Sequence, residues 1–75
     1  MGTKVRSVLA ECAGIVLDVI AREGASVAEG QDLLLFESMK MEIPVEAPCA
    51  GKVVRVCVTK GQVFQENDVL MELEV

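Results

Sequence analysis

Apolar and polar positions alternate along three segments of the chain, as in strands that bury one face. Between Met41 and Pro48, apolar residues occupy every second position and Glu or Pro the positions between. Residues 53–59 and 69–75 show the same period of two, which is typical of half-buried strands. No window longer than about ten residues has helical periodicity. The pattern therefore predicts an all-β fold.

The chain also resembles itself when it is shifted by 37 positions. Residues 8–37 then align with residues 45–74, and 11 of the 30 aligned pairs are identical. Two copies are too few for a solenoid. They indicate one domain, covering residues 1–75, in which two small sheets pack on each other or close into a flattened barrel around a quasi-twofold axis.

The repeat predicts which side chains share a face. Leu17 and Val19 are expected to point inward together with Val54 and Val56. Glycines between the apolar segments are expected at turns with positive φ or where two backbones approach closely; these are Gly14, Gly24, Gly30, Gly51 and Gly61.

Composition and charge exclude several classes of function. The chain has 75 residues, no His and a net charge of −5. We therefore expect no nucleic-acid binding, no metal site and no autonomous catalysis. No segment has the roughly 18 apolar residues of a membrane span. Three cysteines without a C-x-x-C pair predict small buried residues in a reducing compartment, and hence a cytoplasmic protein; they are Cys12, Cys49 and Cys57.

Two residues, Met39 and Lys40, separate two predicted strands at residues 33–38 and 41–45, so a two-residue hairpin is expected there. Such turns favour Asn-Gly or Asp-Gly because both central residues can need positive φ. A lysine at this tip carries a mostly protonated amine, so an external enzyme would have to acylate it. Alternatively, Lys40 only solvates the turn, and Met39 and Met41 fold back as core filler, Met41 being in phase with the inward face.

The segment Glu37-Ser38-Met39-Lys40-Met41-Glu42 resembles the biotin-attachment signature of biotin carboxyl carrier proteins, in which Ala is commoner than Ser before the Met-Lys-Met centre. Frame residues along about residues 5 to 75 also match this family, including Gly24, Gly30 and the Ala47-Pro48 pair. The resemblance implies a barrel-sandwich hybrid of two four-stranded sheets. The nearly gap-free repeat leaves no room for the thumb insertion of some bacterial carriers.

The resemblance also implies a function. Biotin would be attached to Lys40 by a biotin protein ligase that recognises Met39, Met41, Glu37 and Ser38. The biotin would then carry a carboxyl group from a biotin carboxylase to a carboxyltransferase. The chain would thus be a monomeric, non-catalytic carrier of a carboxylase that acts on acetyl-CoA or another acyl-CoA. The acidic residues of this region would face basic partner surfaces; alternatively, they are ordinary solvated strand residues. They are Glu37, Glu42 and Glu46.

Two other functions stay open from the sequence. A lipoyl domain shares the fold and the lysine at a hairpin, although its centre is usually Asp-Lys-Ala. A β-barrel interaction module without any prosthetic group would leave Lys40 unmodified.

Overall fold

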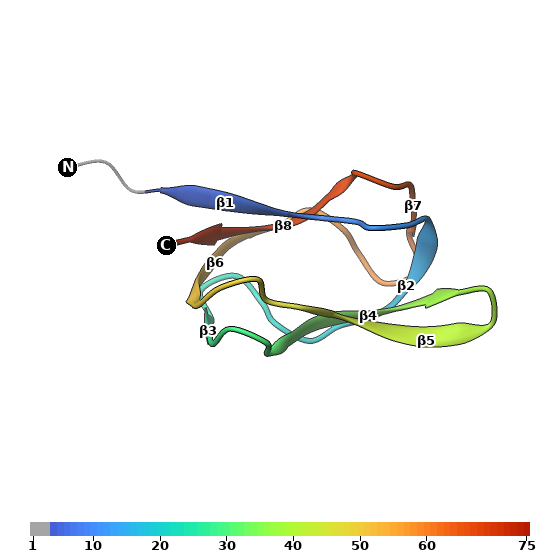
Figure 1. Cartoon of the computed structure of the whole chain (residues 1–75), viewed down its shortest axis with the longest axis horizontal. Coiled ribbons are helices and arrows are strands. Elements are labelled where there is room, and N and C mark those ends of the chain that lie inside the picture. Colours follow the sequence, from blue (N-terminus) through green and yellow to red (C-terminus); the bar gives the residue numbers. More distant parts are fainter. Residues whose placement is uncertain (1–3) are drawn as a thin grey trace.

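The computed structural model describes residues 4–75, whose regular structure consists of β-strands (Figure 1). No helix in this part of the chain has the length and apolar character needed to cross a membrane. The strands are β1 (Val5–Leu9), β2 (Gly14–Val19), β3 (Ser26–Val27), β4 (Asp32–Ser38), β5 (Met41–Glu46), β6 (Gly51–Val56), β7 (Val63–Phe64) and β8 (Val69–Glu74).

The strands form two antiparallel sheets of four strands each. Their orders are β1-β8-β6-β3 and β5-β4-β2-β7. A shift of 37 residues converts β1 into β5, β2 into β6, β3 into β7 and β4 into β8, so each sheet becomes the other. The all-β prediction and the two four-stranded sheets are confirmed.

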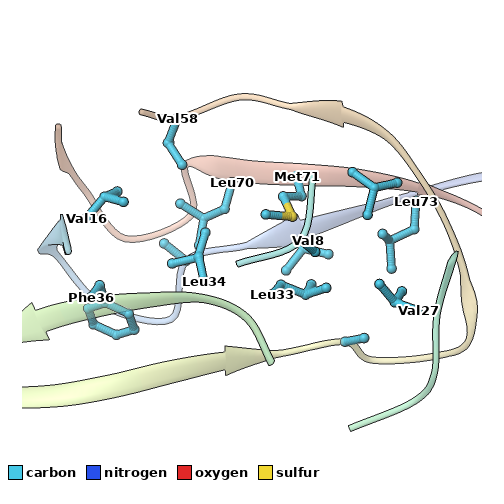
Figure 2. Close-up of a cluster of buried hydrophobic side chains, with 14 of the residues drawn as sticks. Val8, Val16, Val27, Leu33, Leu34, Phe36, Val58, Leu70, Met71 and Leu73 are labelled. Carbon is cyan, nitrogen blue, oxygen red and sulfur yellow. The ribbon is translucent and has the colours of Figure 1, made fainter. Parts of the chain in front are cut away.

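The core lies between the two sheets, where side chains from both point toward one another (Figure 2). The aromatic rings of Phe36 and Phe64 pack edge to face, with 5.3 Å between their centroids, an arrangement that adds about 0.5–1.5 kcal/mol to the burial of area. The buried hydrophobic residues of the first half are Val8, Ala10, Val16, Ala21, Val27, Leu33, Leu34 and Phe36. Those of the second half are Ala47, Val53, Val58, Phe64, Leu70, Met71 and Leu73, which all occupy equivalent positions in the repeat.

Two β-bulges interrupt the alternation of inward and outward side chains that the sequence predicted for β2 and β6. The register between β2 and β4 shifts around Leu17, and the register between β6 and β8 shifts around Val54. An extra residue in one strand breaks the alternation of faces. As a result Val16 and Val53 are the fully buried residues, Val54 is exposed, and Leu17 is only half-buried. The prediction that Leu17 and Val54 point inward was wrong.

The glycines occupy the two kinds of position that were predicted. Gly24, Gly30 and Gly61 have φ between 83° and 92°, in the region that side chains disfavour. Gly14 has no such φ but a close approach: a Cβ there would lie 2.6 Å from Cδ2 of Phe36. The backbone of β2 thus passes so close to Phe36 of β4 that position 14 has no room for a side chain.

The expected burial of the cysteines was wrong. Cys12 and Cys57 are exposed, and Cys49 is partly exposed. Cys12 and Cys49 lie in the loops that connect β1 to β2 and β5 to β6, and Cys57 follows the last residue of β6. All three therefore lie where the chain leaves the sheets, so none is on an inward face.

Candidate functional site: the β4–β5 hairpin

The β4–β5 hairpin has the predicted two-residue turn. Ser38 pairs with Met41 as the last pair of the ladder, and Met39 and Lys40 connect them with φ of 52° and 65°. Positive φ at both central positions matches the twist of the flanking strands but disfavours side chains. It costs roughly 1–2 kcal/mol for each residue that is not glycine. The turn therefore retains Met and Lys at a cost in stability.

The hairpin extends past the core. Ile43 still packs against the buried residues, but the tip of the hairpin projects beyond the other strands in Figure 1. Met41 keeps the inward phase of Ile43 and is nevertheless 59% exposed, while Met39 is 90% exposed. The alternative in which these methionines fill the core is thus wrong, because β5 outruns the opposite sheet.

Lys40 is exposed at this tip. The only ion pair within residues 4–75 joins Arg55 to Glu72, 3.9 Å apart, in the other sheet. Among the described residues the Lys40 amine therefore has no ion-pair partner that acylation would displace. Residues 4–75 contain no group of three or more His, Cys, Asp or Glu side chains placed to hold a metal ion.

The structure places the predicted recognition residues around this lysine. Ser38 and Met41 pair next to the turn, and Glu37 lies directly opposite Glu42 one step further along. Both glutamates are exposed, so two like charges face each other, which is destabilising. Glu46 was expected with them but pairs near the other end of the hairpin, opposite Asp32.

A shallow apolar groove beside the hairpin was not predicted from the sequence. It is lined by Ala13, Gly14, Ile15, Glu37, Ser38, Met39 and Val63. Ile15 pairs with Glu37 on one side and with Val63 on the other, so β4, β2 and β7 contribute a continuous row. The strand β7 has only two residues, too few to show an alternation from which the exposure of Val63 could be read.

Comparison with known proteins identifies the family. The model of the family described as biotin-requiring enzyme matches residues 5–73. The chain belongs to this family, and its cofactor class is biotin.

Two relatives show in which settings such a chain occurs. The chain is 46% identical over 68 residues to the alpha subunit of the mitochondrial methylcrotonoyl-CoA carboxylase of Oryza sativa subsp. japonica. The aligned region covers 91% of the chain and 9% of that protein. The chain is 48% identical over 63 residues to the biotinylated protein TB7.3 homolog of Mycobacterium leprae, covering 84% of the chain and 89% of that protein. The chain thus spans a small part of one relative and most of the other.

A solved structure has the same fold. A single-chain, multi-domain long-chain acyl-CoA carboxylase matches with a TM-score of 0.88 and 40% identity, over 93% of this chain and 7% of that one. The chain is therefore similar to the biotin carrier part of carboxylases, a part that is not itself catalytic.

Proposed function

We propose that Lys40 carries biotin and that the chain serves as the carboxyl carrier domain of a biotin-dependent carboxylase. The observation that carries this proposal is the exposed Met39-Lys40 turn, in which both residues have positive φ. Gly or Asn would fit this backbone at lower cost. Strain that persists in an exposed turn is typical of functional sites, and the family membership gives the chemistry.

The surroundings of Lys40 fit a cofactor attached through an amide. The side chain is exposed, and its amine has no ion-pair partner among residues 4–75. Ser38 and Met41, which flank the turn, form the last pair of the β4–β5 ladder. The backbone hydrogen bonds of this ladder therefore hold the attachment point. When bound, biotin supplies the ureido group on which a carboxyl group travels between a biotin carboxylase and a carboxyltransferase.

The attachment is an acyl transfer to Nζ of Lys40. The unprotonated amine attacks the acyl carbon of a biotinyl-adenylate, an amide C–N bond forms, and the bond from that carbon to the phosphate oxygen breaks with release of AMP. A biotin protein ligase supplies the activated acyl group and the base that accepts the proton. Glu37, Ser38, Met39 and Met41 are the flanks that we expect the ligase to bind.

The fold suits a monomeric carrier that visits two active sites. The described chain is 43 Å long, and its C-terminus and β1 lie at the end opposite to the hairpin tip (Figure 1). A carrier that is tethered at that end presents its cofactor to both active sites at an effective concentration of roughly millimolar, without tight docking.

The resemblance to two carboxylases that are named for acyl-CoA substrates supports an acyl-CoA as the final acceptor. The free cysteines support a reducing compartment such as the cytoplasm.

Labelling by a biotin protein ligase tests the proposal, with Lys40→Arg as the variant and Lys60→Arg as the matched control. Lys60 is also an exposed turn lysine, but Thr59 and Gly61 flank it instead of methionines. We expect the wild type and K60R to take up one biotin each, and K40R to take up none while it unfolds at the same temperature. The labelled wild type should then accept a carboxyl group from bicarbonate in the presence of ATP and a biotin carboxylase. Persistent labelling of K40R would refute the site, and labelling without carboxylation would refute the carrier role.

A further inference from the structure

The two halves of the molecule have equivalent cores but different outer faces. In the sheet that contains the hairpin, Val63, Ile15, Glu37 and Glu42 form a row across β7, β2, β4 and β5. The equivalent row of the other sheet consists of Ser26, Lys52, Glu74 and Val5. Ser26 and Lys52, which are polar, thus occupy the positions that Val63 and Ile15 occupy in the hairpin sheet.

The same difference continues along the outer face. Leu35 is half-buried on β4, two residues before Glu37, and its equivalent in the repeat is Glu72, which pairs with Arg55. The outward positions of Ile15, Leu35 and Val63 are therefore apolar in the hairpin sheet and polar in the other sheet. We call Ile15, Leu35, Val63 and the adjacent Met39 the outer patch.

The core does not require the outer patch. Val63 is 64% exposed and Met39 is 90% exposed. The other sheet packs against the same core with Lys52 and Ser26 at the positions of Ile15 and Val63. Ile15 and Leu35 are half-buried beside Val63 and Met39, and apolar side chains that gather on an accessible face where the core does not need them mark interaction surfaces. The groove described above runs through Ile15, Met39 and Val63, so the outer patch is continuous with the attachment turn.

We propose that the outer patch is a docking surface for the biotin protein ligase, and the inference rests on the proposed attachment of biotin to Lys40. The ligase reacts at Nζ itself, so the wall of its active site has to approach the hairpin and the adjoining groove. A carboxylase instead reacts at the far end of the arm, further from this surface. Glu37 and Glu42 border the patch, which fits a ligase surface with an apolar centre and flanking Lys or Arg side chains.

The repeat supplies matched variants for the test. Ile15→Lys and Val63→Ser introduce the residues that the other sheet has at the same positions, and Lys52→Ile and Ser26→Val make the reverse exchange. A lysine at position 15 would face Glu37 as Lys52 faces Glu74, so the exchange is compatible with the sheet. Val63→Thr keeps the side-chain shape and serves if a stronger variant fails to fold. Unfolding temperatures are measured for every variant.

The readout is the initial rate of biotin incorporation at increasing concentrations of the carrier. We expect the I15K/V63S double variant to have a kcat/KM about tenfold below that of the wild type, almost all of it through KM. K52I and S26V should label like the wild type. An unchanged KM in the folded I15K/V63S or V63T variant would overturn the inference while the assignment of Lys40 stands.

Two further outcomes separate the possible errors. Normal biotinylation of the double variant together with slower carboxylation by a biotin carboxylase would assign the outer patch to a different enzyme and overturn the inference. A wild type that is not labelled at Lys40 would overturn the proposed function and the inference together.

Discussion

Replacing Met39 by Gly should stabilise the domain and at the same time impair its modification. Met39 has φ of 52° and is 90% exposed, so the exchange loses almost no buried area. Removing the side chain relieves a left-handed backbone that costs roughly 1–2 kcal/mol. The greater freedom of Gly in the unfolded chain takes back about 0.4–1 kcal/mol. The expected gain in the free energy of unfolding is therefore about 0.5–1 kcal/mol.

The assay is thermal and chemical unfolding of M39G beside two controls. In a domain of this size, 1 kcal/mol shifts the unfolding temperature by roughly 4–8 °C. Met39→Ala removes the same exposed side chain but keeps the backbone cost, so its stability should equal that of the wild type. Gly61→Ala is the reverse change, because φ there is +87° and, apart from the two chain neighbours, no described residue has an atom within 4 Å of the added Cβ. It should destabilise by about 1 kcal/mol or more.

The result that refutes this reasoning is an M39G variant that is no more stable than M39A. In that case the turn would store no strain, and its Met-Lys sequence would need no functional explanation. We expect instead a more stable M39G that a biotin protein ligase labels more slowly than the wild type. A gain in stability coupled to a loss of labelling would show that recognition, and not folding, determines these two residues.

Three further predictions concern the hairpin and its support. Gly14→Ala should lower the free energy of unfolding by about 1–3 kcal/mol, measured with urea, because the new Cβ would lie 2.6 Å from a ring carbon of Phe36; an unchanged midpoint would contradict this contact. Glu42→Gln should raise stability by a few tenths of a kcal/mol, since it removes one of two opposed carboxylates, and the gain should fade as salt increases. Dilute peroxide should oxidise Met39 before Met71, which is 0% exposed, as peptide mass will show; equal rates would contradict the described burial.

Much of the architecture follows from the sequence because the chain contains its own duplicate. The shift of 37 residues that aligns Gly14 with Gly51 also converts one sheet into the other. The hairpin could be predicted from the two-residue gap between the strands expected at residues 33–38 and 41–45. The conformation of its turn followed from the requirement for positive φ, which the structure shows at Met39 and Lys40.

What could not be predicted depends on local breaks in the alternation. The bulges fall at Leu17 and Val54, which are both apolar, so the sequence gives no sign that the faces exchange there. Met41 keeps the inward phase, but its exposure depends on how far β5 outruns the opposite sheet. The outer patch depends on the pairing of Ile15 with Val63, a long-range contact that no local pattern reports.

The central claim is that this fold presents Lys40 for the attachment of biotin. The most direct test is the mass of the intact chain, and then of its peptides, after co-expression with a biotin protein ligase, with a known carrier labelled in parallel. We predict one biotinyl increment, located on the peptide that contains residues 37–42. An unshifted mass beside a labelled control, an increment on another lysine, or a lipoyl increment at Lys40 would contradict it.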